Sequence, residues 1–176
     1  MTTVDHIQIR PEKDGDCAAI YEVNRLAFGR ESEARLVDVL RASEHYVPGL
    51  SLVALKGNEI VGHILFTKLC VKSKSGDFIA LALAPVAVRP DLQKRGIGSG
   101  LIVEGLKACK ALGYKAVIVV GHPGYYPRFG FSSARAKGLK TTLPVHDEAF
   151  MALELAPGYL DGTGGLVIYP SEFDEA

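Results

Sequence analysis

The sequence predicts an α+β fold: a mixed, mostly antiparallel sheet with one parallel strand pair, flanked by helices. Two strand-like runs on either side of Gly57-Asn58 predict a β-hairpin. The strand–helix–strand order over residues 78–121 favours a parallel pair, because such a crossover returns the chain in the same direction. A length of 176 residues fits one domain.

The N-terminal part is expected to form one strand and two helices. A short strand at residues 7–10 is followed by a helix over 17–28, which Asp16 is placed to cap. A second helix is predicted over 31–42 from its apolar spacing. The dipeptide at 48–49, Pro-Gly, is expected to break the chain before the next strand.

The hairpin strands are predicted at residues 51–56 and 59–72, which are rich in β-branched and aliphatic side chains. Residues 78–88 are apolar at nearly every position, as in a strand that is buried on both faces. Pro85 conflicts with this prediction because proline cannot donate a hydrogen bond to a sheet. We therefore expect a bulge or a splayed edge at Pro85.

The most regular helix pattern covers residues 95–112 and places its apolar side chains in one stripe. An apolar strand follows at 115–121. The tail is expected to add strands at 150–155 and 165–169.

Composition excludes several classes of protein. The 20 Lys and Arg residues balance 20 Asp and Glu residues, which argues against nucleic acid or an anionic membrane as a partner. Cys17, Cys70 and Cys109 have neither a CxxC pair nor metal-ligand spacing, so we expect reduced thiols and no metal. The start of the chain has no apolar run typical of a secretory signal. These features predict a cytoplasmic protein.

A glycine-rich turn at residues 93–100 lies between a buried strand and the long helix. Gly96 and Gly98 allow a ligand to approach the backbone closely, and the helix start offers unpaired N–H groups. Lys94 and Arg95 add positive charge, so the turn is suited to a phosphate. Its spacing fits neither a P-loop nor a dinucleotide-binding turn.

Residues 86–101, VAVRPDLQKRGIGSGL, resemble the acetyl-CoA-binding motif of the GCN5-related N-acetyltransferase (GNAT) family. The family motif is [Q/R]-x-x-G-x-[G/A] after a strand that ends V-x-P. Residues 126–131, YPRFGF, resemble the family's Y-x-[K/R]-x-G-F segment, and 121–131 resemble an uncharacterised bacterial branch of predicted N-acetyltransferases. The resemblance implies one N-acetyltransferase domain over 1–176, with its core at about 7–135 and C-terminal strands and tail at 136–176.

The resemblance implies acetyl-CoA as the acyl donor, with no metal. The pyrophosphate is expected on backbone amides at the helix start, and the pantetheine arm beside the end of strand 78–88. That strand is expected to splay from strand 115–121 and open a V-shaped slot. The implied cofactor-binding residues are Val86, Ala87, Val88, Gln93, Lys94, Arg95, Gly96, Ile97, Gly98 and Ser99.

The reaction that the family implies is direct transfer, in which an amine attacks the thioester carbonyl. The backbone N–H of Val86 or Val88 is expected to stabilise the oxyanion. Tyr126 aligns with the family's general-acid tyrosine and is expected to protonate the leaving thiolate from a phenol of pKa ~10. Packing at a helix start is the alternative role for Tyr126 and for its neighbour Tyr125.

A general base is not assigned from the sequence. His122, at a strand end near the slot, and His63, on a central strand, are candidates, and packing is the more common role for a histidine in either place. Glu104 is expected on the solvated face of the long helix.

The sequence therefore predicts an acetyl-CoA-dependent N-acetyltransferase that acts on an amine of an unidentified small molecule or peptide. The alternatives are a non-catalytic acyl-CoA sensor on the same fold, and transfer of another acyl group or to an oxygen. The predicted partners are acetyl-CoA and the amine acceptor, and a homodimer is allowed.

Overall fold

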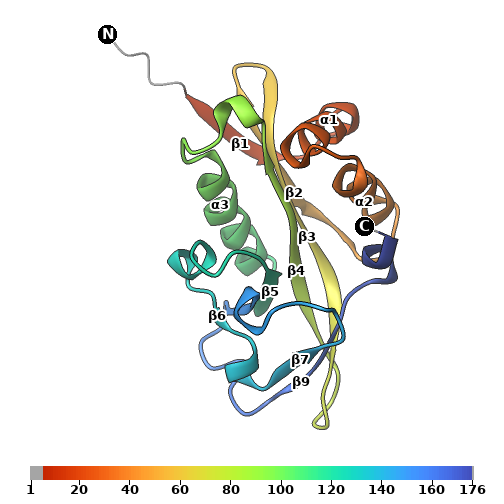
Figure 1. The fold of residues 1–176 in the computed structure, drawn as a ribbon, viewed down its shortest axis with the longest axis vertical. Coiled ribbons are helices and arrows are strands. Elements are labelled where there is room, and N and C mark those ends of the chain that lie inside the picture. The colour runs from red at the N-terminus through yellow and green to blue at the C-terminus, as the bar shows by residue number, and fades with distance from the viewer. Residues whose placement is uncertain (1–5, 176) are drawn as a thin grey trace.

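The computed structural model describes residues 6–175 and consists of one sheet with helices on both sides (Figure 1). Its main path runs β1-β2-β3-β4-β5-β8-β6, and β9 joins β3 and β7. The strands are β1 (Ile7–Pro11), β2 (Tyr46–Lys56), β3 (Glu59–Lys72), β4 (Phe78–Val88), β5 (Ala116–Val120), β6 (Ser132–Ser133), β7 (Leu139–Thr141), β8 (Phe150–Glu154) and β9 (Gly165–Ile168). The helices are α1 (Cys17–Phe28), α2 (Ser32–Arg41) and α3 (Ile97–Ala111).

Short 3₁₀ turns connect these elements. They are η1 (Pro90–Leu92), η2 (Tyr126–Phe129), η3 (Arg135–Lys137), η4 (Asp147–Ala149) and η5 (Ser171–Glu175). Of these, η1 precedes α3 and η2 follows β5, so both lie beside the predicted slot.

The sheet separates two apolar layers. Helices α1 and α2 cover one face and α3 covers the other (Figure 1). Neighbouring residues of β2 show the alternation: Leu52 packs in the layer under α3, whereas Val53 packs in the layer under α1 and α2. Strands buried on both faces are apolar at successive positions, which explains why these strands lack a polar face.

Helix α3 lies unusually close to the sheet at Gly105. A Cβ atom at this position would lie 2.4 Å from Cε2 of Phe66 on β3, so only glycine fits without a shift. This contact fixes the height of α3 above the central strands, and with it the place of the glycine-rich turn.

The predicted fold class is confirmed, with the sheet mostly antiparallel. One detail was wrong: β7 and β9 form a second parallel pair, beside the predicted pair of β4 and β5. The predicted break at Pro48-Gly49 was also wrong, because β2 runs through it with a register shift between Tyr46 and Ser51. Asp16 precedes α1, but its carboxylate accepts from the Lys13 N–H and from Arg10 and does not cap the helix.

Strand β4 carries the predicted irregularity at Pro85. Its register against β3 passes from Val86–Ile64 to Leu83–Phe66, so β4 holds one extra residue there. Strand β4 pairs with β5 only at Leu81 and Ala82. The end of β4 therefore extends past β5 and leaves an open edge.

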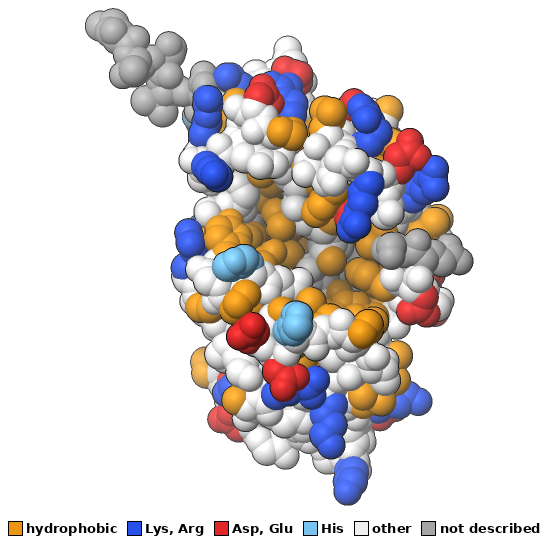
Figure 2. All heavy atoms as spheres, in the orientation of Figure 1, with side chains coloured by type: hydrophobic (Ala, Val, Ile, Leu, Met, Phe, Trp, Pro, Cys, Tyr) orange, Lys and Arg blue, Asp and Glu red, His pale blue; other side chains and the backbone are white. Residues whose placement is uncertain are grey.

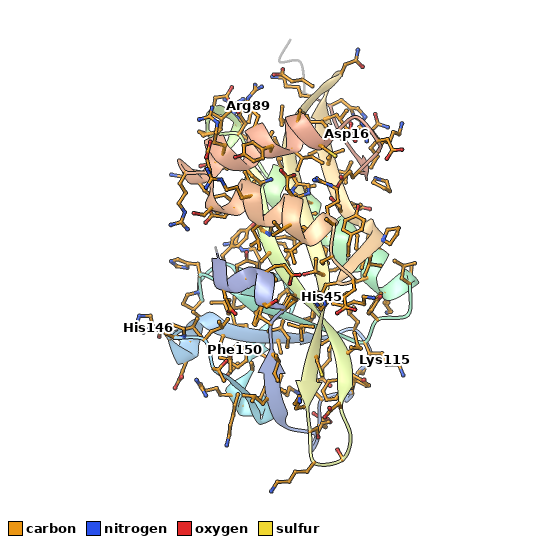
Figure 3. The ribbon with its side chains drawn as sticks, turned by 90° about the vertical axis from the view of Figure 1, so that its right-hand side faces the viewer. Asp16, His45, Arg89, Lys115, His146 and Phe150 are labelled. Carbon is orange, nitrogen blue, oxygen red and sulfur yellow. The ribbon has the colours of Figure 1, made fainter. Side chains whose placement is uncertain are left out.

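The C-terminal strands close the other half of the molecule. Strand β8 pairs along the whole of β5, and β9 pairs with the end of β3 at residues 70–72. Phe150 of β8 is fully buried and lies in the lower half of Figure 3. Arg89 and Asp16 lie at the opposite end of the molecule in the same view.

The surface mixes both signs of charge, and hydrophobic side chains gather in a hollow near the middle of the face in Figure 2. Within residues 6–175, no helix is long and apolar enough to cross a bilayer. The same residues contain no group of three or more His, Cys, Asp or Glu side chains that could hold a metal ion.

Candidate functional site

The start of α3 presents unpaired backbone N–H groups. Gly96 stands at the N-cap position with φ of 87°, and the first hydrogen bond of the helix runs from the Gly100 N–H to the Gly96 carbonyl, 3.0 Å. The N–H groups of Ile97, Gly98 and Ser99 precede that bond and have no partner within the helix. Together with the helix dipole they form an anion site.

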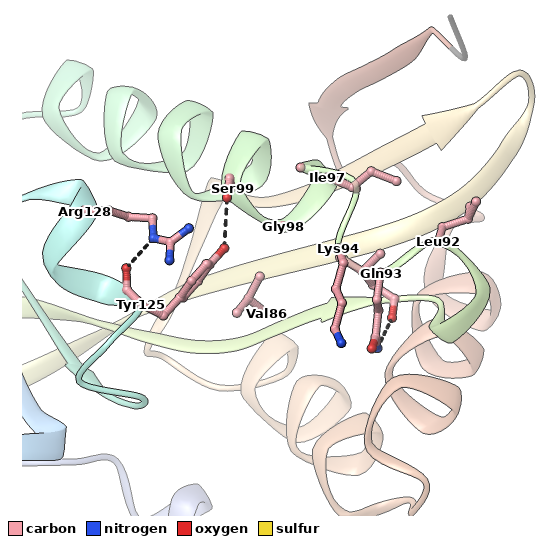
Figure 4. A pocket seen from close by; sticks show the side chains of 11 residues that line it. Val86, Leu92, Gln93, Lys94, Ile97, Gly98, Ser99, Tyr125 and Arg128 are labelled. Carbon is pink, nitrogen blue, oxygen red and sulfur yellow. Dashed lines mark hydrogen bonds between the residues drawn. The ribbon is translucent and has the colours of Figure 1, made fainter. Parts of the chain in front are cut away.

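A pocket of about 550 Å³ opens in front of this helix start (Figure 4). It is bounded by the end of β4, the turn before α3, the first turn of α3 and the η2 segment. Its lining residues are Val86, Val88, Leu92, Gln93, Lys94, Gly96, Ile97, Gly98, Ser99, Tyr125 and Arg128.

The exposed edge of β4 contributes two further backbone donors. The Arg89 N–H donates to the Val61 carbonyl, 2.8 Å, and Ala87 lies opposite His63. Since hydrogen-bonded pairs alternate along an antiparallel ladder, the N–H groups of Val86 and Val88 point away from β3. They face the side on which β5 has already ended its pairing with β4.

Most of the predicted cofactor residues line this pocket. They are Val86, Val88, Gln93, Lys94, Gly96, Ile97, Gly98 and Ser99. Ala87 and Arg95 do not line it: Ala87 is 2% exposed and, as the residue between Val86 and Val88, faces the opposite side of the strand, and Arg95 is exposed outside it. The Gln93 amide donates to the Val88 carbonyl, 3.0 Å, and so braces the end of β4.

Tyr126 is the first residue of η2, which follows β5, and it is not among the lining residues of the pocket. Its ring packs on Gly121, where a Cβ atom would lie 2.3 Å from Cε2 of Tyr126. The same ring packs edge-to-face with Phe131, and the two ring centres are 5.8 Å apart. Burial raises the pKa of Tyr126 to about 12, above the ordinary phenol value assumed from the sequence. The phenol therefore stays protonated through the whole neutral and mildly alkaline range.

Two pocket residues were not expected to bind cofactor, Tyr125 and Arg128. The Tyr125 hydroxyl lies 3.1 Å from the Ser99 Oγ, so η2 is tied to the first turn of α3. The Arg128 guanidinium lies over the Tyr125 ring, 4.6 Å from its centre. The two residues are 26 and 29 positions after Ser99, and only the return of the chain through β5 brings them to the helix start.

His63 occupies the sheet beneath α1 and is fully buried. The Asn24 amide, which also donates to the Ile20 carbonyl, lies 3.1 Å from His63 Nδ1, and Ser51 Oγ lies 2.9 Å from Nε2. Ser51 in turn hydrogen-bonds the Glu12 carboxylate. With Asn24 donating, His63 is neutral and carries its proton on Nε2.

Burial, with the Arg41 charge, lowers the pKa of His63 to about 3. Both ring nitrogens are occupied by protein partners, which fits the packing role. His122 is exposed, and its Nδ1 accepts the Gly124 N–H at 3.0 Å.

The three cysteines lie away from the pocket lining. Cys109 is buried inside α3, and burial raises the pKa of its thiol to about 12, so a thiolate is disfavoured there. Cys17 is exposed on α1 and Cys70 is half-buried on β3. This placement fits a direct transfer without a cysteine intermediate.

Comparison with known proteins gives consistent matches. The family model described as "Acetyltransferase (GNAT) domain" matches residues 8–134. The uncharacterised N-acetyltransferase YjhQ of Escherichia coli K12 is 39% identical over 147 residues, which cover 83% of this chain and 81% of YjhQ. The uncharacterised N-acetyltransferase YhbS of the same strain is 32% identical over 166 residues, 94% of this chain and 98% of YhbS.

Solved structures agree with these relatives. The crystal structure of E. coli YhbS in complex with CoA matches with a TM-score of 0.89 and 30% identity, over 99% of this chain and 95% of that one. A GNAT family acetyltransferase from Brucella melitensis in complex with acetyl-CoA matches with a TM-score of 0.78 and 32% identity, over 97% and 99% of the two chains. From its fold, its helix-start site and these matches, the chain belongs to the GNAT family of N-acetyltransferases.

Proposed function

We propose that this protein transfers the acetyl group of acetyl-CoA directly to an amine of a small molecule or peptide. The observation that carries the proposal is the pocket itself, which joins an anion site at the start of α3 to an unpaired strand edge on β4. A long donor with phosphates at one end and amide groups along its arm matches both parts. Crystals of YhbS with CoA and of the Brucella enzyme with acetyl-CoA support this choice of donor.

The pyrophosphate would accept hydrogen bonds from the N–H groups of Ile97, Gly98 and Ser99. The pantetheine arm would run beside β4 as an added strand. The thioester carbonyl would then meet an N–H of Val86 or Val88, which strengthens its hydrogen bond as the oxygen gains charge. Ala87 would contribute backbone alone, since its side chain faces the other layer.

The neutral amine would attack the thioester carbon, forming the C–N bond as the carbonyl becomes an oxyanion. The nitrogen releases its extra proton to water, and collapse of the intermediate breaks the C–S bond as the sulfur leaves with the electron pair. The Tyr126 hydroxyl would donate to this sulfur. Because the pKa of Tyr126 is about 12, the phenol gives up its proton less readily than an ordinary tyrosine and acts first as a hydrogen-bond donor to the thiolate.

The test is a panel of amines assayed for thiol release from acetyl-CoA, together with calorimetry of CoA binding. Turnover with at least one amine, with acetylated product identified by mass, is the expected result. Tight CoA binding without turnover on any amine would instead identify an acyl-CoA sensor. Absence of CoA binding in the folded protein would overturn the proposed donor site.

A further inference from the structure

Tyr125 links the η2 segment to α3 across the mouth of the pocket. Its hydroxyl lies 3.1 Å from the Ser99 Oγ, and its ring lines the pocket beside Val86 and Val88 (Figure 4). A Cβ atom at Gly98 would lie 3.6 Å from the Tyr125 hydroxyl, an ordinary van der Waals contact, so the hydroxyl lies directly beside the first turn of α3. The ring therefore occupies a fixed place next to the unpaired amides of the helix start.

Arg128 is held on that ring by two contacts. Its guanidinium carbon lies 4.6 Å from the ring centre, and its Nε donates to the Tyr125 carbonyl at 3.0 Å. A guanidinium that stacks on an aromatic face and uses only Nε keeps its terminal N–H groups for another acceptor. Since Arg128 lines the pocket, those groups are available to a ligand inside it.

The charges around the pocket differ in whether they are neutralised. Arg89, near the turn, binds Asp91 and Glu59. Across the part of the chain that the structure describes, neither Lys94 nor Arg128 forms a salt bridge with a carboxylate. Lys94 and Arg128 lie on opposite sides of the helix start in Figure 4, so two unneutralised cations flank the unpaired amides.

We propose that Arg128, positioned by the ring of Tyr125, binds a phosphate group of the acyl donor and sets the preference for CoA over donors that lack phosphates. The proposal rests on the proposed function, because it takes CoA as the ligand of this pocket. Guanidinium–phosphate pairs are frequently bidentate and charge-assisted, and two free terminal nitrogens suit that geometry. CoA has two kinds of phosphate, a pyrophosphate and a 3′-phosphate, and either presents the chemistry that Arg128 recognises.

Calorimetry with CoA, 3′-dephospho-CoA and pantetheine tests the proposal on wild type, Arg128→Gln and a control, Arg35→Gln. Arg35 is an exposed arginine of α2 that pairs with Glu31, on the opposite face of the sheet. At low salt, Arg128→Gln should weaken CoA binding about tenfold or more, and the difference should shrink as salt rises. Pantetheine binding should not change, and Arg35→Gln should match wild type for every ligand.

The ligand series also identifies the phosphate. If Arg128→Gln weakens CoA but not 3′-dephospho-CoA, the partner is the 3′-phosphate; equal losses indicate the pyrophosphate. Unchanged CoA affinity at low salt would overturn the proposal, as would the same loss on pantetheine, which would mean a general change in pocket shape. A wild-type protein that binds no CoA would overturn the proposed function itself, and this inference with it.

The positioning role of Tyr125 needs its own variants. Tyr125→Leu removes the platform and should reduce CoA affinity, after which Arg128→Gln should have little further effect. Tyr125→Phe keeps the ring and loses only the Ser99 hydrogen bond, so the full effect of Arg128→Gln should persist in that background. Additive losses in the Tyr125→Leu background would show that Arg128 acts without the ring.

Discussion

Gly96 has two properties that make it a direct probe of the anion site. Its φ of 87° favours glycine, and a Cβ atom there would meet no other atom within 4 Å, so a side chain would project into open space at the helix start. Gly96→Asp and Gly96→Asn differ only in charge, and both residues tolerate this backbone region better than most.

We predict that Gly96→Asp abolishes CoA binding, because its carboxylate would repel the pyrophosphate, while Gly96→Asn retains weakened binding. Calorimetry against CoA measures the difference, and circular dichroism checks that both variants fold. Equal affinities for the two variants would mean that no phosphate lies beside residue 96.

Tyr126→Phe removes one hydroxyl and keeps the ring that packs on Gly121 and Phe131. If the hydroxyl stabilises the departing thiolate, kcat should fall by about 10²–10⁴-fold while KM for acetyl-CoA changes little. Because the pKa of Tyr126 is about 12, wild-type kcat should not decline between pH 8 and pH 10 through loss of this proton.

Tyr125→Phe is the control and should keep kcat within a few-fold of wild type. Its effect should fall on cofactor affinity, since Tyr125 contacts Ser99 at the helix start. Should Tyr126→Phe turn over an accepted amine as fast as wild type, water would be the proton source for the thiolate.

His63 predicts a dependence of stability on pH. Its pKa is about 3 in the folded protein and near the ordinary 6.5 when unfolded, so the unfolded chain binds one more proton between these values. The free energy of unfolding should therefore fall as pH drops below 6.5, by up to ~1.4 kcal/mol per pH unit from this group.

Urea unfolding at pH 7, 6 and 5 measures this slope. His63→Gln has no titrating group and should give a flatter profile, at the cost of some stability at pH 7. The same slope in both proteins would show that His63 is not the group responsible.

Single residues differ in how far the sequence reveals their place. The residues of the helix start are contiguous, so one motif identified most of the pocket lining. Tyr125 and Arg128 could not be assigned in this way, because their position depends on η2 folding back onto α3. The pKa of Tyr126 likewise depends on its burial, which no local pattern encodes.

Among the elements, the turn before α3 contains a strained residue. Lys94 is the one non-glycine residue with positive φ, 63°, among residues 6–175, and it lines the pocket. A left-handed conformation costs a non-glycine residue roughly 1–2 kcal/mol. We interpret the backbone strain at Lys94 as the cost of placing a cation beside the anion site.

Lys94→Gly and Lys94→Ala separate charge from strain. Both remove the cation and should weaken CoA binding equally, by about 0.5–2 kcal/mol at low salt. Only glycine adopts this backbone conformation without strain. The free energy of unfolding of Lys94→Gly, measured with denaturant, should therefore exceed that of Lys94→Ala by about 1 kcal/mol. A less stable glycine variant would argue that residue 94 is not strained.

Element boundaries were predictable where the local pattern and the packing agree, as in α3 and β5. Strand β2 shows where they disagree. Pro48-Gly49 is a local breaker, yet pairing with β3 resumes at Ser51, and the fully buried Leu50 anchors the bulge. The turn at residues 57–58 sets the pairing of β2 with β3 near the hairpin end, but the register shifts between Tyr46 and Ser51 and between Ala54 and Leu55 are not encoded in a local pattern.

At the scale of the whole molecule, the tail is part of the sheet. Strand β8 pairs with every residue of β5. Its fully buried Phe150 packs in an apolar cluster with Leu160 and Val167. Without the tail, β5 would present an unpaired edge and this cluster would lose one side. The motif-bearing part, about residues 7–135, therefore depends on residues 136–176 for its stability.

We predict that a chain ending at residue 135 does not fold, because it loses β7, β8, β9 and the core residues that they bury. A chain ending at residue 170 is the matched control. It keeps all nine strands. It loses η5, and with it the edge-to-face contact of Phe173 with Tyr169, whose ring centres are 5.1 Å apart, so it should fold with reduced stability. Circular dichroism and size-exclusion chromatography distinguish the two outcomes. A monomeric, cooperatively unfolding 1–135 chain would show that β5 tolerates an open edge and that the tail serves the acceptor side of the slot instead.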